Sequence, residues 1–214
     1  MRVGTRARAA LLCCGLVAAL LYVGADLLAA VRYGAYHRFA SQAISELSAV
    51  GAPTKPLVDP FLSAFALLLG AFGLGVRTAA GRCRRLRLMG GLLVTIGILC
   101  LLWPPMYLRG TGGFSRDLPH MGFGAVVFGL VTGVVGLGSS LGGRRFQVYS
   151  RGTLAVVVIA GALSAFEAIR LELGQPTPWI GISERIGVGA ALLWVAGLAL
   201  RLLRSPHGKR SADI

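Results

Sequence analysis

Residues 9–31, AALLCCGLVAALLYVGADLLAAV, form an apolar run that contains one charged side chain, Asp26. A helix needs about 20 predominantly apolar residues to cross a membrane, so the run predicts a spanning helix. A carboxylate in the hydrocarbon region is costly and normally faces protein or water, with a partner. The run therefore predicts a membrane protein and raises the question of what Asp26 faces.

Further apolar runs occupy residues 57–76, 88–108, 120–140, 153–172 and 184–203. Of the 214 residues, 55% are hydrophobic and only 14% are charged, whereas soluble domains have about 25% charged residues. We therefore expect an all-α fold, a polytopic membrane bundle of six transmembrane helices at 9–203. A basic cytoplasmic N-terminus would occupy 1–8 and a disordered cytoplasmic tail 204–214. If the first run were instead a cleaved signal peptide, the orientation of the other five spans would not change.

The basic residues are distributed unevenly between the two sides of this predicted bundle. A net charge of +14 could indicate nucleic-acid binding. However, the basic residues recur in short patches between the apolar runs, and we expect no nucleic-acid partner. Of the 22 lysines and arginines, 15 fall on the side of the N-terminus and 7 on the other side. This bias predicts that both termini are cytoplasmic.

The first outer segment, 32–56, contains a pattern of its own in YHRFASQAISELSAVGAP, residues 36–53. One helical face is shared by Ala40, Ala43, Ile44 and Leu47, and another face is shared by Ser41, Ser45 and Ser48. Gly51 and Pro53 then provide a stop signal. We expect a short amphipathic helix at the outer surface. Elsewhere, Gly129 and Gly133 form a G-x-x-x-G pair that predicts close helix packing.

The acidic residues are gathered on the outer side, a skew that the orientation rule does not require. Seven of the eight acidic residues lie there: Asp26, Glu46, Asp59, Asp117, Glu167, Glu172 and Glu184. Asp26 lies about 7 Å inside the outer end of its span, and Glu167 lies at a similar depth. The cations available at that level are Arg32, Arg170 and Arg185, and Arg170 is three residues after Glu167 on the same helix face. We expect Asp26 to point into the bundle, towards an arginine or histidine of another helix.

These groups can be interpreted as a polar pocket that opens outwards. Its ligand-binding candidates are Asp26, Glu46, His120, Glu167, Glu184 and Arg185, with Ser45 and Asp117 beside them. The alternative is that the same groups form ion pairs, helix caps and interfacial anchors. Asp117 is suited to be the N-cap of the fourth span, and Glu184 to the start of the sixth.

Three classes of function fit this pattern. The first is a non-enzymatic protein that binds membrane lipids through a head group, or binds a membrane-protein partner or a second copy of itself. The second is a membrane-embedded lipid hydrolase at the outer leaflet. It would use Ser45 as nucleophile, His120 as base and Asp117 or Glu46 as orienter, although the chain has no G-x-S-x-G elbow. The third, a transporter, is disfavoured because the central thirds of the spans are almost free of charge.

The cysteines lack metal-ligand spacing, and we expect no metal or other cofactor. A zinc site built from His37, His120 and a carboxylate is the alternative that stays open.

Four segments in this order resemble a prokaryotic six-helix membrane family known as domain of unknown function 998. They are ISELSAVGAPTKPLVDP at 44–60, LLWPP at 101–105, DLPHMGFG at 117–124 and SERIGVGAALLW at 183–194. The resemblance covers about residues 10–203 and implies a multi-pass protein of the prokaryotic inner (plasma) membrane, without an established activity. A more distant likeness is to eukaryotic six-helix proteins of the Frag1 and DRAM type, some of which act in lipid-anchor remodelling.

Overall fold

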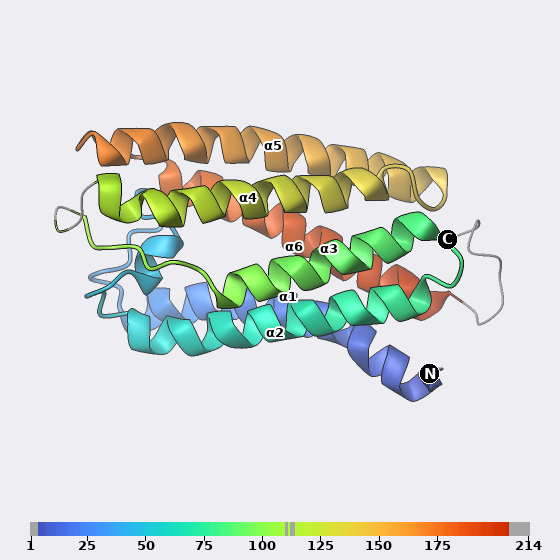
Figure 1. Ribbon diagram of the computed structural model, residues 1–214. Coiled ribbons are helices and arrows are strands. Elements are labelled where there is room, and N and C mark those ends of the chain that lie inside the picture. Colours follow the sequence, from blue (N-terminus) through green and yellow to red (C-terminus); the bar gives the residue numbers. More distant parts are fainter. Residues whose placement is uncertain (1–3, 110, 112–113, 206–214) are drawn as a thin grey trace.

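The computed structural model describes residues 4–109, 111 and 114–205, and this part of the chain forms six α-helices (Figure 1). They are α1 (Thr5–Arg32), α2 (Lys55–Ala79), α3 (Arg84–Leu101), α4 (Phe114–Gly138), α5 (Arg144–Glu172) and α6 (Ile180–Arg204). The described residues contain no strand, only an isolated bridge between Val50 and Tyr107. The predicted all-α fold is confirmed, whereas the tail predicted to be disordered lies almost wholly outside the described residues.

Five of the six helices, all except α3, are long and apolar enough to cross a membrane. The predicted third span, 88–108, needs correction because α3 begins earlier, at Arg84, and ends earlier, at Leu101. The cause of the early end is Pro104–Pro105, since a residue that precedes proline is disfavoured in the α conformation. The apolar part of α3, 88–101, is therefore only about 21 Å long.

The helices run back and forth along one bundle (Figure 1). α2 packs against α1 and α3, α6 packs against α1 and α5, and α4 lies against α3 and α5. α1 begins and α6 ends at the same end, together with the α2–α3 and α4–α5 connections (Figure 1). We call this end, which carries the arginine-rich connections, the basic end. The opposite end, formed by 33–54, 102–109 and 173–179, is called the capped end.

Glycines permit the closest helix contact, that between α2 and α3. A Cβ on Gly73 would lie 2.7 Å from the backbone nitrogen of Val94, and one on Gly90 would lie 2.7 Å from the carbonyl oxygen of Gly73. Small residues let membrane helices approach at this distance. The close packing predicted at Gly129 and Gly133 is not seen, because nothing in the described chain lies within 4 Å of a Cβ added at either position.

The loop between α1 and α2 folds back over the bundle instead of forming an amphipathic helix at the surface. It contains a single 3-10 turn, η1 (Ser45–Ser48), and Leu47 of this turn is fully buried. The Thr54 hydroxyl donates to the carbonyl oxygen of Leu47 at 2.6 Å. The predicted stop is present at Gly51, whose φ of 91° suits glycine. Ala43, Ile44 and Leu47 of this loop are all buried. The apolar pattern thus reflects the burial of loop residues, and helical periodicity does not account for it.

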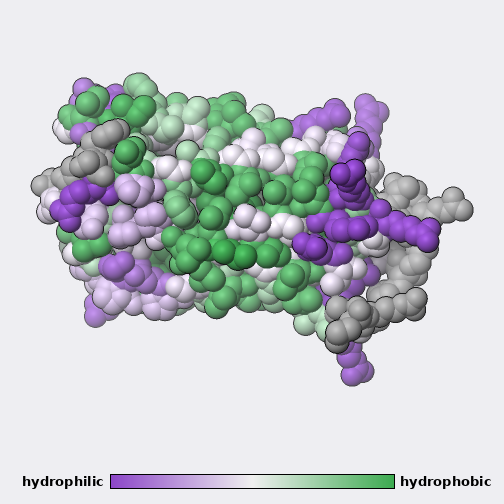
Figure 2. All heavy atoms as spheres, in the orientation of Figure 1, coloured by the Kyte–Doolittle hydropathy of each residue, from purple (hydrophilic) through white to green (hydrophobic). Residues whose placement is uncertain are grey.

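The surface of the bundle has the polarity of a membrane protein. Figure 2 shows hydrophobic side chains along the middle of the visible face and hydrophilic residues at both ends. Large apolar side chains such as Leu20, Ile159 and Leu193 are more than half exposed. Such a band is stable in contact with lipid and not with water. Together with the five long apolar helices, it identifies an integral membrane protein.

Candidate functional site

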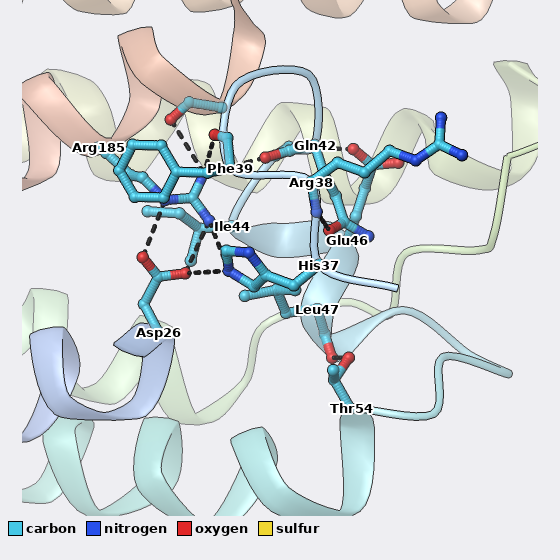
Figure 3. Close-up of polar contacts among 12 residues, drawn as sticks. Asp26, His37, Arg38, Phe39, Gln42, Ile44, Glu46, Leu47, Thr54 and Arg185 are labelled. Carbon is cyan, nitrogen blue, oxygen red and sulfur yellow. Dashed lines mark hydrogen bonds and ion pairs between the residues drawn. The ribbon is translucent and has the colours of Figure 1, made fainter. Parts of the chain in front are cut away.

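Asp26 is paired across the bundle with Arg185 of α6 (Figure 3). The Nε of Arg185 donates to Oδ2 of Asp26 at 2.8 Å, and its Nη2 donates to Oδ1 at 2.7 Å. The Nε2 of His37 lies 3.1 Å from the same Oδ1. The side chain of Asp26 is 13% exposed, that of Arg185 is 9% exposed and that of His37 is 3% exposed. The expectation that Asp26 points into the bundle, towards an arginine or histidine, is confirmed.

Arg185 also holds the loop between α1 and α2. Its Nη1 donates at 3.0 Å to the carbonyl oxygens of Phe39 and Gln42. The ring of Phe39 lies over the guanidinium, with its centroid 4.4 Å from Cζ. Because an arginine has five N–H donors in a fixed fork, it can bind a carboxylate and several carbonyls together. Arg185 thus joins α1, the loop and α6.

Two further residues of α6 contact the same loop. Glu184 accepts a 2.6 Å hydrogen bond at Oε2 from the backbone N–H of Ile44. The backbone N–H of Gly181 donates to the carbonyl oxygen of Ala40 at 2.9 Å. Positions 181, 184 and 185 are three and four residues apart, so they share one helix face. The predicted role of Glu184 at the helix start needs correction, because α6 begins at Ile180 and Glu184 lies one turn inside it.

A second charge pair, between Glu46 of η1 and Arg109, joins the segments of the capped end. The Glu46 carboxylate accepts from Nη2 of Arg109 at 2.7 Å and also from its Nε. Nη1 of Arg109 donates to Oγ1 of Thr177 at 2.9 Å, and Nη2 also donates to the carbonyl oxygen of Ser41 at 2.6 Å. The carboxylate of Glu46 raises the pKa of Arg109 above its ordinary value. Arg109 therefore binds the loop and the 173–179 segment together.

Glu167 is buried at the end of α5, next to this network. Its Oε2 accepts a 3.2 Å hydrogen bond from the backbone N–H of Trp179, and its charge also acts on Arg109. The sequence suggested Arg170 as its partner, but the described residues include no ion pair between the two. Arg170 lies instead over the ring of Phe166, 5.8 Å from the centroid.

Asp117 and His120 belong to a different contact, between α4 and the α3–α4 connection. Asp117 accepts from the backbone N–H of Tyr107 at 3.0 Å. It is not the N-cap that its spacing predicted, because α4 already begins at Phe114. His120 Nδ1 lies 2.9 Å from the carbonyl oxygen of Pro104 and 3.0 Å from Nε1 of Trp103. These two residues fix the proline-containing connection to α4.

The candidate catalytic residues are therefore separated among three contacts. Ser45 lies in η1, where Glu184 binds the loop, whereas His120 contacts Trp103 and Pro104. No hydrogen bond joins Ser45 to His120 in the described chain. Over the same residues, no three of the histidine, cysteine, aspartate and glutamate side chains form a group that could hold a metal. His37 and His120 thus have separate partners, and the geometry adds no support for a hydrolase or a zinc site.

The structure brings together five of the predicted ligand-binding residues, Asp26, Glu46, Glu167, Glu184 and Arg185, around the capped end. It does not bring His120 into this group. No sequence pattern marks Arg109 as the partner of Glu46. Arg109 was recognisable as an outer-side cation, but nothing in its spacing from Glu46 indicated that the two residues pair.

A family model described as "Protein of unknown function (DUF998)" matches residues 16–201. The chain belongs to the DUF998 family. The matched region of this family member contains all the charge pairs of the capped end and most of the six helices. No curated protein and no solved structure matches the chain. The family description states no activity, and the likeness to the Frag1 and DRAM type stays a prediction.

Proposed function

We propose that this DUF998 protein is a non-enzymatic membrane protein that binds a phosphate-bearing lipid head group at its capped end. The observation that supports this proposal is the state of Arg109. Its guanidinium is held by Glu46, Thr177 and a backbone carbonyl, yet its side chain is 39% exposed. An arginine fixed in advance loses little side-chain entropy on binding. Because Nε and Nη2 are held by Glu46 and Ser41, the exposed guanidinium offers a phosphate its charge and the second N–H of Nη1.

In this proposal the buried charges hold the site, and Arg109 contacts the ligand. Asp26, Glu184 and Arg185 are engaged with one another or with the loop, so they position the loop and do not line an open pocket. Two exposed aromatic residues also lie at the capped end, Phe39 in the loop 33–54 and Trp179 in the segment 173–179. Aromatic side chains favour the depth of lipid head groups. From the charge bias we expect the capped end to lie on the outer side of a prokaryotic inner membrane, facing the outer leaflet.

The test is to count the phospholipids retained by the protein after purification in mild detergent, by native mass spectrometry. Arg109→Gln is expected to lower the retained phospholipid several-fold, because the exposed donor is lost. Arg32→Gln is the matched control. Arg32 is an exposed arginine of the same end, and its described contact is with the ring of Tyr33. This control is expected to retain phospholipid as the unchanged protein does.

Loss of Arg109 could also unfold the capped end, since the buried Glu46 carboxylate would lose its cation. The double variant Glu46→Gln/Arg109→Gln removes both charges and avoids that cost. If the double variant is folded and retains the same amount of phospholipid as the unchanged protein, the proposal is wrong. Arg109→Lys keeps the charge but not the fork, and we expect it to retain an intermediate amount.

A further inference from the structure

The basic end carries a concentration of arginines that have no acidic neighbour among the described residues, and we infer that this end binds an anionic phospholipid. The arginine cluster consists of Arg82, Arg84, Arg85, Arg87, Arg144 and Arg145, which are all exposed. Nη1 of Arg85 lies 3.4 Å from the carbonyl oxygen of Ser140, so the α2–α3 and α4–α5 connections are neighbours. Figure 2 shows hydrophilic residues gathered at this end of the molecule.

The arginine cluster has no carboxylate from the described chain to neutralise it. All seven described acidic residues lie near the capped end, and so do the four described ion pairs. At physiological ionic strength, charges are largely screened from one another only beyond about 8 Å. Neighbouring guanidinium groups within that distance therefore repel one another. A bound anion would relieve this repulsion. The capped end differs because two of its arginines, Arg109 and Arg185, are paired with carboxylates.

The position of the arginine cluster favours a lipid over a soluble anion. Arg84 is followed four residues later by exposed Leu88, and Arg144 is followed by exposed Val148. Residues four apart lie on one face of a helix, about one turn from each other. Each face therefore changes from guanidinium to apolar side chain over the distance that separates the phosphate of a lipid from its acyl chains. Arginine also binds phosphate with two parallel hydrogen bonds.

The experiment compares phosphatidylglycerol with phosphatidylcholine of identical acyl chains, added to the purified full-length protein. The readout is the number of bound lipids by native mass spectrometry. The unchanged protein is expected to prefer phosphatidylglycerol, and the preference should fall as salt is raised. Since one arginine near an anionic surface contributes roughly fivefold in affinity, Arg84→Gln/Arg144→Gln should weaken phosphatidylglycerol binding by about 30-fold.

The matched control removes two exposed arginines from the capped end, Arg32→Gln/Arg38→Gln, which changes the net charge equally. This control should keep most of the preference. Equal loss in both double variants would contradict the inference, as would equal binding of the two lipids by the unchanged protein. Displacement of phosphatidylglycerol by millimolar inorganic phosphate would show a site for free phosphate and would also overturn it. Because Arg109 is unaltered in these variants, the outcome is separate from that of the head-group test at the capped end.

Discussion

At the scale of single residues, the charge inside the first span is explained by a pair that joins distant parts of the chain. Asp26 and Arg185 are 159 positions apart, and each makes two hydrogen bonds with the other. An isolated carboxylate at this depth would be costly, but a bidentate partner and His37 offset much of that cost. The pair therefore specifies how α1, α6 and the loop meet.

Removal of the Asp26 charge should destabilise the protein strongly. Asp26→Asn leaves the guanidinium of Arg185 in a mostly buried position without its counter-charge, and breaking such a pair costs about 3 kcal/mol. For a chain of this length, that is a fall in apparent Tm of roughly 6–12 °C. The measurement is thermal unfolding of the purified protein in detergent.

Asp59→Asn is the matched control for this measurement. Asp59 pairs with Lys55 at 2.8 Å, and the two side chains are 39% and 36% exposed. An exposed pair contributes about 0–1 kcal/mol, so this variant should change Tm little. If the two variants melt at the same temperature, the Asp26 pair does not hold the bundle together.

The sequence indicates that a charged residue needs a partner more reliably than it indicates which residue the partner is. The depth of Asp26 in an apolar run was sufficient to predict that it faces an arginine or histidine. The pair of Glu46 and Arg109 has no such signal, because both residues lie in loops where no periodicity restricts their position. Glu167 and Arg170 show the opposite error, since their spacing suggested a pair that is not among the described ion pairs.

At the scale of elements, two departures from the predicted helices have physical causes in the chain. The apolar composition of 88–108 continues past the helix, because hydropathy does not register the backbone restriction imposed by Pro104 and Pro105. The loop pattern at 40–47 fits a helix face, but it also fits a compact turn whose apolar residues are buried. Tertiary contacts with α6 decide between the two.

The contact between the loop and α6 depends on Gly181, which offers a test at this scale. A Cβ there would collide with the carbonyl oxygens of Phe39 and Gln42, both backbone atoms of the loop. Gly181→Ala should therefore displace the loop and weaken its bonds with Arg185. We expect faster proteolysis within residues 33–54 and a lower Tm, both measured on purified protein.

Gly133→Ala is the control for this prediction, because a Cβ at this helical position has nothing within 4 Å. In a helix interior, alanine is more favourable than glycine by up to about 1 kcal/mol. This variant should be as resistant to protease as the unchanged protein and equally or slightly more stable. Equal protease sensitivity of the two variants would show that the loop does not depend on close approach at Gly181.

At the scale of the whole molecule, charge is divided between the two ends of the bundle. The described acidic residues lie towards the capped end, and the arginine-rich connections form the basic end. An excess of arginine on one side marks the cytoplasmic face. The two ends differ in how their charges are paired, because Asp26, Glu46 and Asp59 of the capped end form ion pairs, whereas the arginine cluster has no acidic partner in the described chain.

This division predicts the sidedness of the protein, which single-cysteine labelling can test. With Cys13, Cys14, Cys83 and Cys100 replaced by alanine, one cysteine is introduced at exposed Val50 of the capped end or at exposed Arg82 of the basic end. A membrane-impermeant maleimide is then applied to spheroplasts. We expect Val50→Cys to react on intact spheroplasts and Arg82→Cys to react only after lysis, because the basic end should face the cytoplasm. The reverse pattern would place the capped end inside, and the head group proposed to bind Arg109 would then belong to the inner leaflet.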